Sequence, residues 1–153
     1  MSYRTFFGLA KEPFAADLEI DAILTTAELL GVQERLEYAV RLGAIALVTG
    51  KVGAGKSTAL RWSYGQFHPS RFKILWITAS AGSILEIYRQ LLAELDINTA
   101  SSSRAVLTRL IRAQIKNLVT TKKQQPVMII DEASLVCNFG VVWLQCKSSV
   151  EIL

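Results

Sequence analysis

The chain has 153 residues, 51% of them hydrophobic, and a formal net charge of +4. This length suits one domain with a sizeable core. No apolar run approaches the 18 or so residues of a membrane span, and Lys11 and Glu12 lie where a signal peptide would be apolar. These features argue against membrane-spanning and exported proteins, so we expect a cytoplasmic protein. The two cysteines, Cys137 and Cys146, match no zinc spacing with the single His68 and are interpreted as reduced thiols.

The first half of the chain predicts a helix, a strand and a second helix. Thr25 and Glu28 form a capping box that predicts a helix through about Leu42, with Gly43 as its stop. The continuous apolar run 44–49 predicts a buried parallel strand. A helix is expected from about residue 57 to 67.

Between that strand and that helix, residues 50–57 match the P-loop pattern GxxxxGK[ST]. Glycines at 50, 53 and 55 are expected to take positive φ angles, so that backbone N–H groups can surround phosphate oxygens. Lys56 supplies a charge for the β- and γ-phosphates, and Ser57 offers a hydroxyl to Mg²⁺. Thr58 either reaches the α-phosphate or is an ordinary first-turn residue. The predicted nucleotide-binding residues are Gly50, Lys51, Val52, Gly53, Ala54, Gly55, Lys56, Ser57 and Thr58.

Three further elements follow the P-loop helix. Residues 72–78 are rich in β-formers and predict a strand, and a capping box from Ser83 to Glu86 predicts an amphipathic helix to about Leu95. A fourth helix is expected over 104–119. Its polar side carries four basic residues, and two lysines follow it: Arg104, Arg109, Arg112, Lys116, Lys122 and Lys123. This face is either a solvated surface or a contact for the DNA backbone.

The apolar segment 127–132 predicts a strand that ends in two carboxylates, as in a Walker B element. Ligands bind at the carboxyl edge of a parallel sheet, so Asp131 is expected beside the Mg²⁺ that Ser57 holds. Glu132 is expected to orient or deprotonate the attacking water. The predicted catalytic residues are therefore Lys56 and Glu132. The competing interpretation is a buried strand that ends in acidic residues because it reaches solvent there.

The order of these elements predicts an α/β fold, a three-layer P-loop NTPase of AAA type with a parallel sheet. We divide the chain into an N-terminal segment with its helix, 1–43, an ATPase core, 44–135, and an atypical tail, 136–153. ATP and Mg²⁺ are the expected cofactors. No Asn-Lys-x-Asp guanine motif occurs, which favours ATP over GTP.

The chain resembles the ExeA-like (general secretion pathway protein A) AAA ATPases over roughly residues 1–135. The resemblance is carried by Tyr3, the segment 6–9, Pro13 with Phe14, and the two Walker motifs. It implies an ATP-driven regulatory or assembly ATPase whose partner is a transposase or a secretion-assembly protein, and it leaves a homo-oligomer open. The lack of a membrane span favours a transposition helper that contacts DNA over a secretion-assembly ATPase.

The tail 136–153 departs from that family, which continues with further strands, a sensor residue, an arginine finger and a lid. We therefore interpret the C-terminal half as missing, and expect 44–49 to lose its strand neighbours and ATP turnover to be slow or absent. In a second interpretation, residues 141–146 form a strand that completes a smaller sheet. A non-catalytic remnant or interaction module, and a small P-loop kinase, are the alternative functions.

Overall fold

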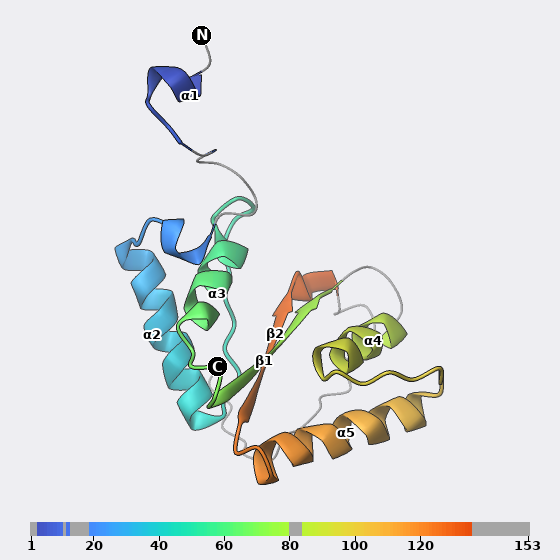
Figure 1. The fold of residues 1–153 in the computed structure, drawn as a ribbon. Helices are drawn as coiled ribbons and strands as arrows, with labels where there is room; N and C mark the ends of the chain where they lie inside the picture. Colours follow the sequence, from blue (N-terminus) through green and yellow to red (C-terminus); the bar gives the residue numbers. More distant parts are fainter. Residues whose placement is uncertain (1–2, 11, 13–18, 80–83, 136–153) are drawn as a thin grey trace.

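The computed structural model describes residues 3–10, 12, 19–79 and 84–135. The predicted tail, its proposed strand and the segment around Pro13 and Phe14 lie outside the described residues. Figure 1 shows the arrangement of the elements. In chain order the elements are α1 (Tyr3–Phe6), the 3₁₀ turn η1 (Ile20–Ala22), α2 (Ala27–Leu42), α3 (Lys56–Gly65), β1 (Phe72–Thr78), α4 (Ile84–Glu94), α5 (Arg104–Thr120), β2 (Gln125–Asp131) and the 3₁₀ turn η2 (Ala133–Leu135).

The two strands pair in parallel, from Phe72 with Gln125 to Thr78 with Asp131. Helices α4 and α5 lie on one side of this sheet, and α2 and α3 lie on the other (Figure 1). Leu75 and Ile77 are buried against α4 and α5 in the larger hydrophobic cluster. An α/β fold with parallel strands, as predicted, is confirmed for the described residues, and β1 has the predicted bounds.

A second, smaller hydrophobic cluster joins α2 to α3, and its buried members are Leu29, Ala59 and Trp62. Two aromatic contacts connect this helix pair to the sheet. The ring centroids of Tyr64 and Trp76 are 5.4 Å apart, and those of Phe67 and Phe72 are 5.1 Å apart. The described residues thus form two cores, one on each side of the sheet.

The predicted buried strand at 44–49 is wrong, because this segment is neither helix nor strand in the structure. Ile45 is 69% exposed and Leu47 is 81% exposed. A strand exists only where neighbouring strands pair with its backbone, and among the described residues β2 pairs only with β1. Among the described residues, no strand pairs with this segment.

Helix α2 begins one residue later than the sequence indicated. Its N-cap is Thr26, not Thr25, and the Thr26 Oγ1 atom accepts a hydrogen bond from the Leu29 N–H at 3.3 Å. Hydrogen bonds from its own backbone N–H and from the Thr26 hydroxyl lower the pKa of Glu28. Gly43 ends the helix at φ 65°, as predicted.

The cap assignment predicts different effects for two adjacent threonines. Thr26→Ala should lower the free energy of unfolding by about 1 kcal/mol, because the Leu29 N–H loses its acceptor. Thr25→Ala removes the same atoms but leaves the Leu29 N–H with its acceptor. It should lower the free energy of unfolding by less than about half as much as Thr26→Ala. Urea denaturation of the two variants and the parent measures the difference, and equal losses would contradict the assignment.

Candidate functional site at the carboxyl edge of the sheet

The P-loop connects the unpaired segment 44–49 to α3. Gly53 and Gly55 both have φ 78°, the left-handed region that glycine adopts without strain. Gly50 has no positive φ, contrary to the prediction, and a Cβ atom there would meet Ala54 Cβ at an ordinary 3.6 Å. Only the later two glycines are therefore required by backbone conformation.

Lys56 is held over the loop that it follows. Its Nζ atom donates to the carbonyl oxygens of Gly50 at 3.2 Å and of Lys51 at 3.0 Å. Helix α3 begins at Lys56, and its N-cap, Gly55, gives no side-chain hydrogen bond to the first turn. Free first-turn N–H groups, the positive end of the helix dipole and an ammonium group together favour a phosphate at this position.

Ser57 and Asp131 come together across 74 residues of sequence. The Ser57 Oγ atom donates to Asp131 Oδ1 at 3.2 Å, and the Glu132 N–H donates to the same oxygen at 3.0 Å. A hydroxyl and a carboxylate are the hard oxygen ligands that Mg²⁺ prefers, and Mg²⁺ usually completes its shell with phosphates and water. Among the described residues no group of three or more His, Cys, Asp or Glu side chains could hold a metal ion. The two residues predicted to hold Mg²⁺, Ser57 and Asp131, lie within hydrogen-bond distance of each other.

Glu132 follows Asp131 in an uncommon backbone conformation, with φ 55°. A non-glycine residue in this region carries strain, which proteins tend to retain at functional positions. The side chain is exposed, as a residue that orients water at an open nucleotide site needs to be. Val52 and Thr58 are exposed as well, whereas Lys56, Ser57 and Asp131 are half-buried.

One residue at this edge belongs to none of the sequence motifs. Thr78 is the last residue of β1 and pairs in register with Asp131. The only signal in the sequence was its position, a polar residue that ends an apolar strand.

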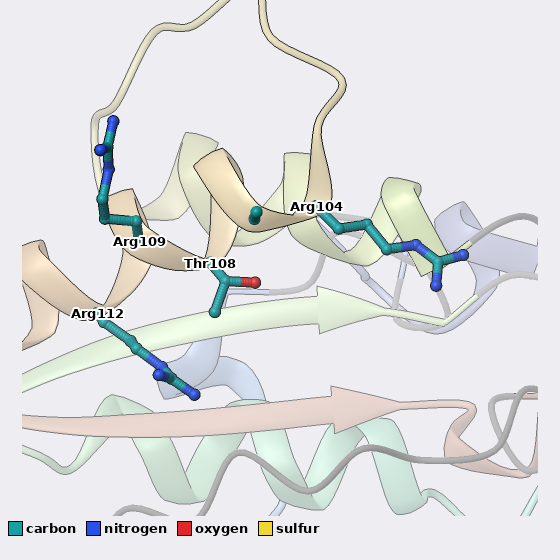
Figure 2. Close-up of a pocket in the computed structure, with 5 residues that line it drawn as sticks. Arg104, Thr108, Arg109 and Arg112 are labelled. Carbon is teal, nitrogen blue, oxygen red and sulfur yellow. The ribbon is translucent and has the colours of Figure 1, made fainter.

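The predicted basic face of α5 is present, and it lies on the other side of the sheet from α3 (Figure 1). Figure 2 shows Arg104, Thr108 and Arg112 on successive turns of the helix, with Arg109 beside them. They line an open pocket of about 530 Å³ together with Ala105. Within the described part of the chain, none of these arginines is in an ion pair.

Comparison with known proteins gives one family match. A family model described as an AAA domain matches residues 40–148. The match covers the P-loop and the end of β2, and it continues past Leu135 into the segment that the sequence analysis separated as an atypical tail. Searches of curated proteins and of solved structures found no match. Within the described residues, no helix has the length and apolar character needed to cross a membrane.

The backbone of Glu132 predicts an unusual ranking of substitutions. Glu132→Gly should give a free energy of unfolding about 1 kcal/mol higher than Glu132→Ala, because glycine relieves the strain of a positive φ and alanine does not. Both variants lose the carboxylate, so the comparison isolates the backbone. Thermal or urea unfolding measures it, and an alanine variant at least as stable as the glycine variant would show that no strain is stored there.

Proposed function

The chain belongs to the AAA domain family, an ATP-binding ATPase family, and on that basis we propose that it binds MgATP between the P-loop and the end of β2. The observation that carries the proposal is the contact between the hydroxyl of Ser57 and the carboxylate of Asp131 at 3.2 Å. It brings the two halves of a phosphate and metal site to one edge of the sheet.

Each residue has a distinct role in this proposal. The backbone of the loop 50–55 and Lys56 bind the phosphates, and Ser57 and Asp131 hold the ion. When bound, Mg²⁺ neutralises charge on the β- and γ-phosphates. Glu132 orients the water that attacks the γ-phosphate and accepts its proton.

Turnover is expected to be slow, because few contacts fix the distance between Lys56 and Asp131. In the described residues, the segment that leads into the P-loop makes no strand pairing with β2. Its outward Ile45 and Leu47 side chains are not packed. An error of about 1 Å in the position of a reacting group can cost a hundredfold in rate. The same exposure favours a second candidate function, a nucleotide-binding interaction module with no turnover.

For the cellular role we retain an ExeA-like regulatory or assembly ATPase, with a transposase or a secretion-assembly protein as partner. The DNA backbone is the proposed second ligand, and charge distribution supports it. Residues 1–96 contain ten basic and ten acidic residues, whereas residues 97–130 contain six basic residues and no acidic one. The positive charge of the chain is thus concentrated on α5 and the turn after it, and four of the six basic residues lie on α5.

The nucleotide proposal predicts a specific effect of one lysine. Lys56→Ala should weaken MgATP binding at least tenfold, about 1.4 kcal/mol or more, because the phosphates lose a charge-assisted hydrogen bond. Lys73→Ala is the matched control, since it removes the same charge from β1, on the face turned away from α3. Calorimetric titration compares the two variants with the parent. Equal affinity in all three would overturn the proposal.

The DNA proposal predicts a change in salt dependence. Replacing both Arg109 and Arg112 by Gln should weaken binding to a random duplex and reduce the slope of log K against log salt by about 2, because two phosphate contacts are lost. The control double variant, Arg35→Gln with Arg41→Gln, removes equal charge from the exposed side of α2. Fluorescence anisotropy at several salt concentrations measures both slopes. An identical fall of the slope in both double variants would mean that only net charge matters for binding and that the basic face of α5 is merely solvated.

A further inference from the structure

Thr78 lies beside Asp131 on the nucleotide side of the sheet. The two residues are register partners in adjacent parallel strands, so their side chains project to the same face. Leu75 and Ile77 of β1 pack toward α4 and α5, and side chains alternate along a strand. Trp76, which contacts Tyr64 of α3, marks the opposite face, and Thr78 shares that face with Trp76. The hydroxyl of Thr78 is thus on the same side of the sheet as Ser57 and the P-loop.

The backbone of Thr78 is fixed by a side chain from α4. The Thr78 N–H donates to Gln90 Oε1 at 2.9 Å, and Gln90 Nε2 donates to the Thr78 carbonyl oxygen at 3.1 Å. These groups point away from β2. Backbone groups of Arg71, just before β1, and of Ala79, just after Thr78, bond to β2. The backbone groups of Thr78 therefore face the opposite edge of the strand. Gln90 therefore takes the place of a neighbouring strand at the free edge of β1.

This clamp fixes the backbone of the β1 residue that pairs in register with Asp131. Strand ends without such partners fray, since their backbone groups bond to water instead. The Thr78 hydroxyl itself makes no hydrogen bond to another described residue, and Thr78 is exposed. Among the described residues, an ordered backbone thus presents a hydroxyl without a hydrogen-bond partner at the register position of Asp131.

We propose that Thr78 is a further positioning residue of the nucleotide site, and that its hydroxyl binds a water molecule of the Mg²⁺ shell. The inference rests on the proposed function, because it needs the ion that Ser57 and Asp131 would hold. Mg²⁺ keeps several of its waters when it binds to protein. Groups that hydrogen-bond to the metal's own ligands typically change metal affinity by 10- to 100-fold. Gln90 acts one step further away, through the backbone of Thr78.

The test measures ADP affinity as a function of Mg²⁺ concentration by calorimetry, so it does not depend on turnover. Thr78→Val has the same shape without the hydroxyl, and the Mg²⁺ concentration that gives half of the full enhancement of ADP binding should rise about tenfold. Thr78→Ser keeps the hydroxyl and should stay within about twofold of the parent. In EDTA all three proteins should bind ADP equally, because the phosphate contacts of the P-loop are unchanged. A merely structural role for Thr78 would change binding in EDTA as well.

A second variant tests the clamp without touching the hydroxyl. Gln90→Met removes both hydrogen bonds to Thr78 and should shift the Mg²⁺ dependence in the same direction as Thr78→Val. Thr78→Ala replaces the valine variant if that protein fails to fold. If Mg²⁺ does not enhance ADP binding to the parent, the proposed function itself fails. If the parent responds and both the hydroxyl-free variant and Gln90→Met titrate as the parent does, the inference about Thr78 is overturned.

Discussion

The hydrogen bond between Ser57 and Asp131 is the contact on which the functional site depends. It joins α3, which contributes to the smaller hydrophobic cluster, to the end of β2, which pairs with β1 of the larger cluster. In an uninterrupted sheet the strand before the P-loop would be paired with neighbours and would set this distance by its register. Here that strand is not formed, so polar contacts and the Tyr64–Trp76 pair connect the P-loop helix to the sheet, and the Phe67–Phe72 pair connects the turn after it.

The segment 44–49 shows the consequence of this missing strand pairing, which is the exposure of apolar side chains. Two hydrogen bonds fix the start of this segment. Gln125 Nε2 donates to the Val40 carbonyl oxygen at 2.7 Å, and the Ala44 N–H donates to the Ala39 carbonyl oxygen at 2.8 Å. Beyond its other end, Lys56 bonds to the loop carbonyls. Between these anchors two large apolar side chains face solvent, which is unfavourable by about 1.5–3 kcal/mol for each side chain that would otherwise be fully buried.

Local patterns in the sequence predicted most of the elements, because capping signals and hydrophobic periodicity act over a few residues. The bounds of β1 were predicted to the residue, and α5 to within one. The error at 44–49 has a different cause. An apolar run of strand composition specifies a strand only if other strands lie beside it, and that depends on residues far away in the chain. The Ser57–Asp131 contact was predictable from two motifs, whereas the Gln90 clamp on Thr78 was not, since a glutamine on an amphipathic helix carries no signal for its partner.

The two anion-attracting features of the chain are separated by the sheet. The P-loop leads into α3 on one side of the sheet, and α5, which carries the arginines, lies on the other side (Figure 1). Charges on opposite faces of a protein, more than a Debye length of about 8 Å apart, are largely screened from one another at physiological salt. A phosphate bound at the P-loop therefore does little to weaken the attraction of α5 for a polyanion. Nucleotide and nucleic acid would not compete for one surface, so coupling between them would pass through the contacts that join the two layers, which include β1, β2 and the hydrogen bond from Gln124 to Pro69.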